Sequence, residues 1–146
     1  MLLWPRPSDL VLTSSREILI HWGDCDPAGI VYYPRYFEWF DVSTHQLFRK
    51  AGFPTEHLAE RFGVLGYAMV DTRARFILPS KFGDRVTIET AITEFRRSSF
   101  DVHHKLMANG QLAAEGFETR VWTAHDGPRL KSKPIPDEVK RRLLES

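Results

Sequence analysis

The chain has few features that would tie it together covalently or give it a dominant charge. Its 146 residues include one cysteine, Cys25, which excludes an intramolecular disulfide or a site of several thiolates and favours a reducing compartment. Twenty Lys and Arg stand against 19 Asp and Glu, so no overall basic field indicates a nucleic-acid partner. No run of about 18 apolar residues is present, so no membrane partner is expected. Pro5, Arg6 and Pro7 interrupt any export signal, and we expect a cytoplasmic protein.

What the sequence does contain suits one compact domain. With 42% hydrophobic and 27% charged residues, residues 1–146 have the size and balance of a single globular unit. Within it, residues 1–14 form a lead rich in Pro and Ser that we expect to be irregular. Pro136 is suited to open a short C-terminal helix over residues 136–146.

Hydrophobic periodicity divides the chain into a strand, a long helix and a series of strands. Residues 16–22 alternate as a strand, with Ile18, Ile20 and Trp22 on one face. Apolar residues at three-to-four spacing predict a helix from Pro34 to Ala51. A short helix is expected at residues 55–63, and further strands are expected at residues 66–79, 85–95, 100–106 and 112–124.

One apolar-faced helix followed by consecutive strands predicts an α+β fold. Turn sequences at residues 81–84 and 109–110 favour hairpins, so the last four strands are predicted to form an antiparallel meander. The five-stranded sheet is expected to wrap around the one long helix. One helix cannot cover both faces and both edges of such a sheet, so we expect a homodimer or homotetramer.

Candidate chemistry concentrates between Gly23 and Pro34, where a loop with two carboxylates runs into a helix N-terminus. The free N–H groups of a helix start attract anions, including the oxyanion formed from a carbonyl. Asp26 lies just upstream, and Pro27 keeps it in an extended conformation. A carboxylate beside an oxyanion site is suited to acyl transfer.

Other interpretations of the same residues remain open. Asp24 and Asp26 can simply cap turns and accept hydrogen bonds from loop amides. His21, Asp24 and Asp26 offer N and O ligands, although without the spacing of an established metal motif. Cys25 has no local base and is more typical of a small buried hydrophobe than of a nucleophile.

The stretch GDCDPAGIVYYPRYFEWFD, residues 23–41, resembles the signature of the 4-hydroxybenzoyl-CoA thioesterase family. Segments at residues 86–90, 94–100 and 126–130 are similar to later parts of that family in the same order, so the resemblance covers about residues 16–136. It implies the hotdog fold, in which a five-stranded antiparallel sheet wraps one long helix. The strand pattern predicts the same layout independently.

The resemblance also implies roles for particular residues. Asp26 occupies the position of the catalytic carboxylate, a nucleophile or a general base, and Tyr33 the position whose backbone N–H polarises the thioester carbonyl. Arg96 and Arg97 match a basic segment that binds CoA phosphates, whereas Ser98 stands where the family has a third basic residue. The implied substrate is an aromatic acyl-CoA, and no metal or cofactor beyond its CoA is expected.

Two alternative functions stay open. The first is a thioesterase for short or medium aliphatic acyl-CoA or for acyl carrier protein, which Ser98 makes more plausible. The second is a non-catalytic acyl-CoA-binding module, against which the Asp26 loop argues.

Tyr32, Phe37 and Trp39 are candidates for an acyl pocket or for the core. His103 and His104 point to opposite faces of a strand; we expect one of them to be buried and assign neither a catalytic role.

Overall fold

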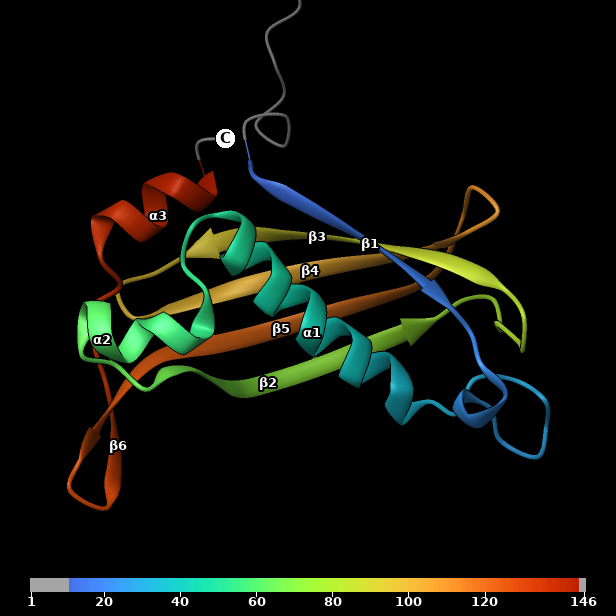
Figure 1. The fold of residues 1–146 in the computed structure, drawn as a ribbon, viewed down its shortest axis with the longest axis horizontal. Coiled ribbons are helices and arrows are strands. Elements are labelled where there is room, and N and C mark those ends of the chain that lie inside the picture. Colours follow the sequence, from blue (N-terminus) through green and yellow to red (C-terminus); the bar gives the residue numbers. More distant parts are fainter. Residues whose placement is uncertain (1–10, 145–146) are drawn as a thin grey trace, which may run out of the picture.

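The computed structural model describes residues 11–144 and has one antiparallel sheet with a long helix across one face (Figure 1). The strands are β1 (Thr13–Leu19), β2 (Gly66–Phe76), β3 (Arg85–Phe95), β4 (Ser99–Ala108), β5 (Gln111–Asp126) and the short β6 (Arg129–Ser132). The α-helices are α1 (Pro34–Lys50), α2 (Leu58–Phe62) and α3 (Asp137–Leu144), with 3-10 turns η2 (Trp22–Asp24) and η3 (Thr55–His57). The predicted α+β hotdog architecture is confirmed, with β6 as an addition that the sequence did not suggest.

The strand order is β1-β3-β4-β5-β2, with β6 beside β5. The predicted four-strand meander is therefore wrong for β2, which pairs with β5 and not with β3. The reason lies in the turn before β3, because Ile20, just after β1, accepts from the Gly83 N–H (2.9 Å) and donates to the Asp84 carbonyl (2.9 Å). These bonds place β3 beside β1, at the other side of the sheet from β2.

The first strand is displaced from its predicted range. It begins at Thr13, within the lead that we expected to be irregular, and it ends at Leu19. Ile18 and Ile20 are both buried, but Trp22, predicted to share their face, starts η2 and is 74% exposed. The first ten residues of the predicted lead lie outside the described part of the chain.

Helix α1 supplies the central packing surface. Gly52, with φ of +94°, follows its last turn in the left-handed region that favours glycine. Of the aromatic candidates on this helix, Trp39 is buried in the core, whereas Phe37 is only partly buried. The buried residues of the helix are Tyr36, Trp39, Phe40, Ser43, Thr44, Leu47 and Phe48.

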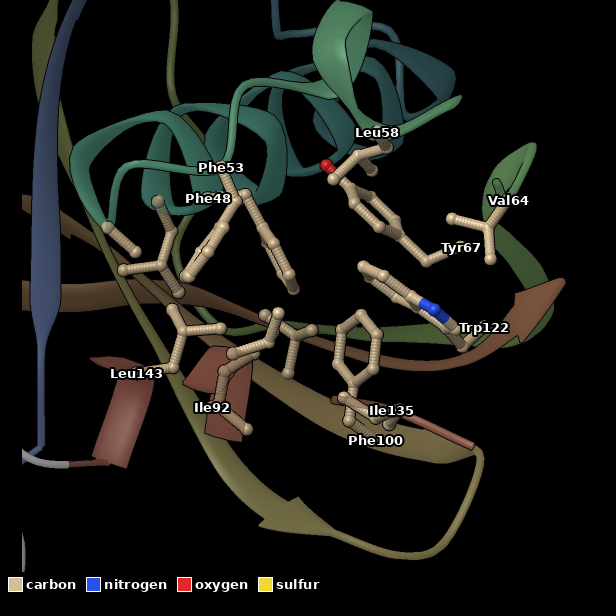
Figure 2. Close-up of a cluster of buried hydrophobic side chains, with 14 of the residues drawn as sticks. Phe48, Phe53, Leu58, Val64, Tyr67, Ile92, Phe100, Trp122, Ile135 and Leu143 are labelled. Carbon is tan, nitrogen blue, oxygen red and sulfur yellow. The ribbon is translucent and has the colours of Figure 1, made fainter. Parts of the chain in front are cut away.

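One of two clusters of buried aromatic side chains lies at the end of the sheet where α1 ends (Figure 2). Tyr67 stacks on Phe48 with ring centroids 4.5 Å apart and meets Phe100 edge-on at 5.7 Å. Leu143 of α3 is fully buried in the same cluster. Helix α3 begins at Asp137, directly after Pro136, and residues 145–146 of the range expected for it lie outside the described chain. Among residues 11–144, no helix combines the length and apolarity needed to cross a bilayer.

Candidate active site

The loop between β1 and α1 is a tight hairpin closed by its own backbone. Cys25 and Val31 form an antiparallel bridge. The Asp26 N–H donates to the Ile30 carbonyl (3.0 Å), and the Gly29 N–H donates to the Asp26 carbonyl (2.9 Å). Gly29 turns the tip with φ of +83°, which side-chain-bearing residues rarely adopt. The backbone therefore fixes the place of Asp26.

The same loop is fastened to the segment between β2 and β3. The Val31 N–H donates to the Ser80 carbonyl (2.9 Å), and Ile30 forms an isolated bridge with Lys81. These contacts bring residues more than 40 positions apart in the chain to one place. The loop and the end of β2 thereby become the two walls of a common site.

Asp26 is partly buried and has one oxygen committed to the loop. Its Oδ1 accepts from the Ala28 N–H at 2.8 Å, a turn-capping hydrogen bond. Its Oδ2 accepts no hydrogen bond from any residue between 11 and 144. The turn-cap interpretation is therefore correct for one oxygen, and the other is available for a ligand.

Tyr33 precedes the first residue of α1, with φ of −54° and ψ of −33°. The Tyr32 N–H donates to the Asp24 carbonyl (2.8 Å), and the Arg35 N–H donates to the Tyr32 carbonyl (2.9 Å). The Tyr33 N–H has no acceptor within the described chain. An open N–H at a helix start carries part of the positive end of the helix dipole and can accept a carbonyl oxygen.

Asp26 and Tyr33 both line one pocket of about 380 Å³, which is in the usual range for small-ligand sites. The Tyr36 ring lies 5.1 Å from the Phe76 ring in its wall. Burial raises the pKa of the Tyr36 hydroxyl, so this phenol stays neutral at ordinary pH. The full lining is Asp26, Ile30, Val31, Tyr33, Tyr36, Phe76, Ile77, Leu78 and Pro79.

A second cavity, of about 360 Å³, lies over β1, β3 and β4. Glu89, His103 and Lys105 are its ionisable lining residues. It has no residue in common with the Asp26 loop and none from the start of α1, so it offers no carboxylate beside an open helix N–H. We therefore place the candidate site at Asp26.

The predicted CoA-binding residues lie at the other end of the sheet (Figure 1). β1 ends at Leu19 opposite Arg85, the first residue of β3, and the Asp26 loop follows β1. Arg96 comes after the last residue of β3, whose 11 residues span about 35 Å. One chain therefore does not bring Asp26 and Arg96 together.

Arg96, Arg97 and Ser98 differ in how far their side chains are free. Arg96 is held by Asp101 (Nη2 to Oδ1, 2.6 Å) and by Glu94, and the Asp101 contact raises the pKa of its guanidinium. The Arg97 side chain is exposed and makes no polar contact among residues 11–144. Ser98 is partly buried, and its carbonyl accepts from the Trp122 N–H (2.7 Å).

Sequence reasoning missed the wall residues Tyr36 and Phe76. Of the proposed aromatic candidates, Tyr32 is 49% exposed and Trp39 belongs to the core, and neither lines the pocket. Tyr36 follows Tyr33 by three residues, a helical spacing that pointed to the same side. Phe76 had no local signal, because the pairing of β2 with β5 positions it.

One of His103 and His104 was expected to be buried, and His104 is, but the polar cluster around it beneath α1 was not predicted. His104, fully buried, contacts Thr90 (Nδ1 to Oγ1, 2.7 Å) and Glu118 (Nε2 to Oε2, 3.0 Å). Arg120 donates through Nε to Glu118 Oε1 (2.8 Å) and through Nη2 to Asp41 (2.6 Å). Within residues 11–144, no three potential metal ligands come together, so His21, Asp24 and Asp26 do not form a metal site there.

Comparison with known proteins gives the family. Residues 20–143 match the thioesterase-like superfamily. The 4-hydroxybenzoyl-CoA thioesterase of Pseudomonas sp. strain CBS-3 is 38% identical over 124 residues, 80% of this chain and 87% of its own. An Asp-to-Asn variant of a 4-hydroxybenzoyl-CoA thioesterase, in a crystal structure with 4-hydroxybenzoyl-CoA, superposes with TM-score 0.84 at 33% identity over 90% of this chain and 99% of its own. A gentisyl-coenzyme A thioesterase gives TM-score 0.77 at 33% identity over 89% and 98%.

The chain belongs to the thioesterase-like superfamily and has its hotdog fold. Within that superfamily it is an acyl-CoA thioesterase of the 4-hydroxybenzoyl-CoA thioesterase family, and so a thioester hydrolase.

Proposed function

We propose that this thioesterase hydrolyses an aromatic, 4-hydroxybenzoyl-CoA-like thioester to the free acid and CoA. Asp26 acts as nucleophile or general base, and the Tyr33 N–H polarises the carbonyl. The observation that carries the proposal is the shared pocket, in which a carboxylate with a free oxygen and an open helix N–H line the same apolar space.

The two groups have complementary tasks. The thioester carbonyl oxygen accepts from the Tyr33 N–H, and the charge that develops on it faces the positive end of α1. Asp26 either attacks the carbonyl carbon, forming an anhydride that water then hydrolyses, or removes a proton from the attacking water. In both routes CoA leaves as a thiolate, which needs little acid assistance. This chemistry calls for no metal or cofactor besides the CoA of the substrate.

Support for an aromatic acyl group comes from the pocket wall. Tyr36 and Phe76 present two rings 5.1 Å apart, and Ile77 to Pro79 add apolar surface. Flat aromatic groups pack well against such rings in offset or edge-on geometry. The relatives named for 4-hydroxybenzoyl-CoA and gentisyl-CoA act on acyl groups of this kind.

We further propose that the enzyme works as a homodimer or homotetramer. The 11-residue edge of β2 has no partner strand on its outer side among residues 11–144, and Met69, Val70 and Phe76 are exposed along it. An edge this long is normally covered in solution. A second copy would also bring its Arg97 to the CoA phosphates, with Arg96 and Ser98 shaping that turn. The single cysteine supports a cytoplasmic enzyme.

The test is thiol release from benzoyl-, 4-hydroxybenzoyl-, acetyl-, hexanoyl- and palmitoyl-CoA by wild type, Asp26→Asn and Asp84→Asn. Asp84 is a matched control, because its Oδ2 also accepts a loop N–H, from Lys81 (3.0 Å), without lining the pocket. We expect aromatic esters to react fastest, and Asp26→Asn to lose at least about 10³-fold in kcat while Asp84→Asn stays near wild type.

Each other result corrects a different part of the proposal. Faster hydrolysis of hexanoyl-CoA would refute the aromatic substrate and keep the mechanism. If Asp26→Asn keeps wild-type activity, as Asp84→Asn is expected to, then Asp26 acts only as a turn cap. If wild type hydrolyses none of the five CoA esters, an acyl carrier protein thioester is tested next, and its hydrolysis would make the carrier protein the substrate.

A further inference from the structure

Asp24 accepts hydrogen bonds from the chain on both sides of the Asp26 loop. Its Oδ2 accepts from the His21 N–H at 2.9 Å, before the loop, and its backbone carbonyl accepts from the Tyr32 N–H at 2.8 Å, after it. The carboxylate is 20% exposed and does not line the pocket. Asp24 therefore contacts the loop and not the substrate space.

Arg35 faces Asp24 from the first turn of α1. Its Nε lies 3.6 Å from Asp24 Oδ1, and its Nη1 donates to both oxygens of Glu38 (3.0 and 3.1 Å). The Nε atom is buried and has no hydrogen-bond partner within residues 11–144. The guanidinium thus pairs with Glu38 through Nη1 and faces the Asp24 carboxylate through Nε, so it spans from the helix to the loop.

We propose that the Asp24–Arg35 ion pair is a latch that fixes the loop on α1 and so sets the position of the Asp26 carboxylate relative to the Tyr33 N–H. The inference rests on the proposed function, since these two groups carry the reaction there. The latch closes across the base of residues 25–34, which contain both groups. Asp24 and Arg35 are positioning residues, because neither lines the pocket.

The chemistry requires tight positioning of this kind. A displacement of about 1 Å of a reacting group can cost roughly 10²-fold in rate. Backbone contacts tie the loop tip to Ser80 and Lys81, in the segment between β2 and β3. Val31 and Cys25 pack in the same apolar cluster as Tyr36, and the ion pair between Asp24 and Arg35 adds a charged side-chain contact between the loop and the helix start.

A double-mutant cycle with Asp24→Asn, Arg35→Gln and the double variant tests the latch. The Asn side-chain oxygen keeps the acceptor for His21, so only the charge is lost. We expect each single variant to lower kcat about 10-fold or more with KM changed less than about 3-fold, and the double variant to be no slower than the worse single variant. Glu38→Gln, which removes the other partner of Arg35, should keep wild-type kcat.

Amide hydrogen exchange of residues 26–33 gives a readout that does not depend on activity. Exchange should quicken in both single variants and stay unchanged in Glu38→Gln. If wild type hydrolyses thioesters and the two effects multiply or are absent, the latch is refuted and the proposed function stands. If wild type hydrolyses no thioester, the proposed function fails, and unchanged exchange in the variants would then refute the latch by itself.

Discussion

At the scale of single residues, Arg120 stands out because it is a buried charge that needs compensating partners. Its side chain is 4% exposed and lies between Glu118 and Asp41. Burial raises the pKa of the Glu118 carboxyl, but the His104 and Arg120 contacts outweigh this and hold it below its usual value. A buried ion pair is stable only when such contacts compensate the lost hydration. The cluster therefore depends on each of its charges.

Asp41 makes this dependence measurable through pH. His45, 3.6 Å from Oδ1, and Arg120, at 2.6 Å, hold the pKa of the Asp41 carboxyl well below its usual range. A depressed folded-state pKa adds stability above the unfolded value of about 3.9, and that stability is lost as the pH falls towards the folded value. Because Asp41 is 49% exposed, we expect Asp41→Asn to cost only about 1 kcal/mol at pH 7.

Urea unfolding from pH 2 to 7 is the measurement. The gap in unfolding free energy between wild type and Asp41→Asn should be full at pH 5 to 7 and shrink below about pH 4. Glu38→Gln, which also removes a carboxylate from α1, serves as the control. Its difference in unfolding free energy from wild type should be small and should not shrink below pH 4. A gap for Asp41→Asn that is the same at pH 2 and 7 would contradict the assignment.

At the scale of elements, the contact of α1 with β5 depends on a missing side chain. A Cβ built on Gly116 would lie 2.5 Å from Phe40 Cδ2 and Cε2, and Phe40 is 1% exposed. We expect Gly116→Ala to lower the unfolding free energy by about 1–3 kcal/mol, because the Phe40 ring has no free space to move into. Thermal and urea unfolding measure the change.

The control for this contact is Gly23→Ala. A Cβ at Gly23 meets nothing within 4 Å, so its effect on stability should stay within about 0.5 kcal/mol. Adding Phe40→Leu to Gly116→Ala should recover part of the loss, since the shorter side chain leaves room. Equal stability of Gly116→Ala and Gly23→Ala would show that the helix shifts freely over the sheet.

Helices and strands that are determined by their own sequence could be predicted, whereas the pairing of strands distant in sequence could not. α1 has its apolar stripe and its glycine stop within its own sequence, and its range was predicted to within one residue. The pairing of β2 with β5 has no local cause, because it depends on Ile20 holding the turn before β3 more than 60 residues later in the chain. Trp39 was left open between the core and an acyl pocket, and its packing against the sheet places it in the core.

The same distinction separates the parts of the candidate site. Asp26 and Tyr33 lie in one continuous loop and helix start, so the residues and the resemblance pointed to both. Phe76 to Pro79 reach the pocket through sheet pairing and through the hydrogen bond from the Val31 N–H to the Ser80 carbonyl. No local sequence pattern predicts either contact. The distance from Asp26 to Arg97 follows from strand direction and register, and a motif match contains neither.

At the scale of the whole molecule, the separation of Asp26 from Arg97 determines how the site is completed. Both groups can serve one CoA ester only if Asp26 of one chain works with Arg97 of another, because β3 separates them by about 35 Å within a chain. Light scattering should then give about two or four times the chain mass of 16.9 kDa. A mass of 16.9 kDa at micromolar concentration would contradict the shared site.

Complementation between two weakened variants tests the shared site directly. Asp26→Asn lacks the carboxylate and Arg97→Gln lacks the proposed phosphate contact, so each homo-oligomer should be impaired at every site. When the two are unfolded together and refolded, mixed dimers contain one site with an intact Asp26 from one chain and an intact Arg97 from the other. We expect thiol release from 4-hydroxybenzoyl-CoA well above the sum of the separate variants, approaching about one quarter of wild type for random pairing. A site formed within one chain would be damaged in every pairing, and mixing would then restore nothing.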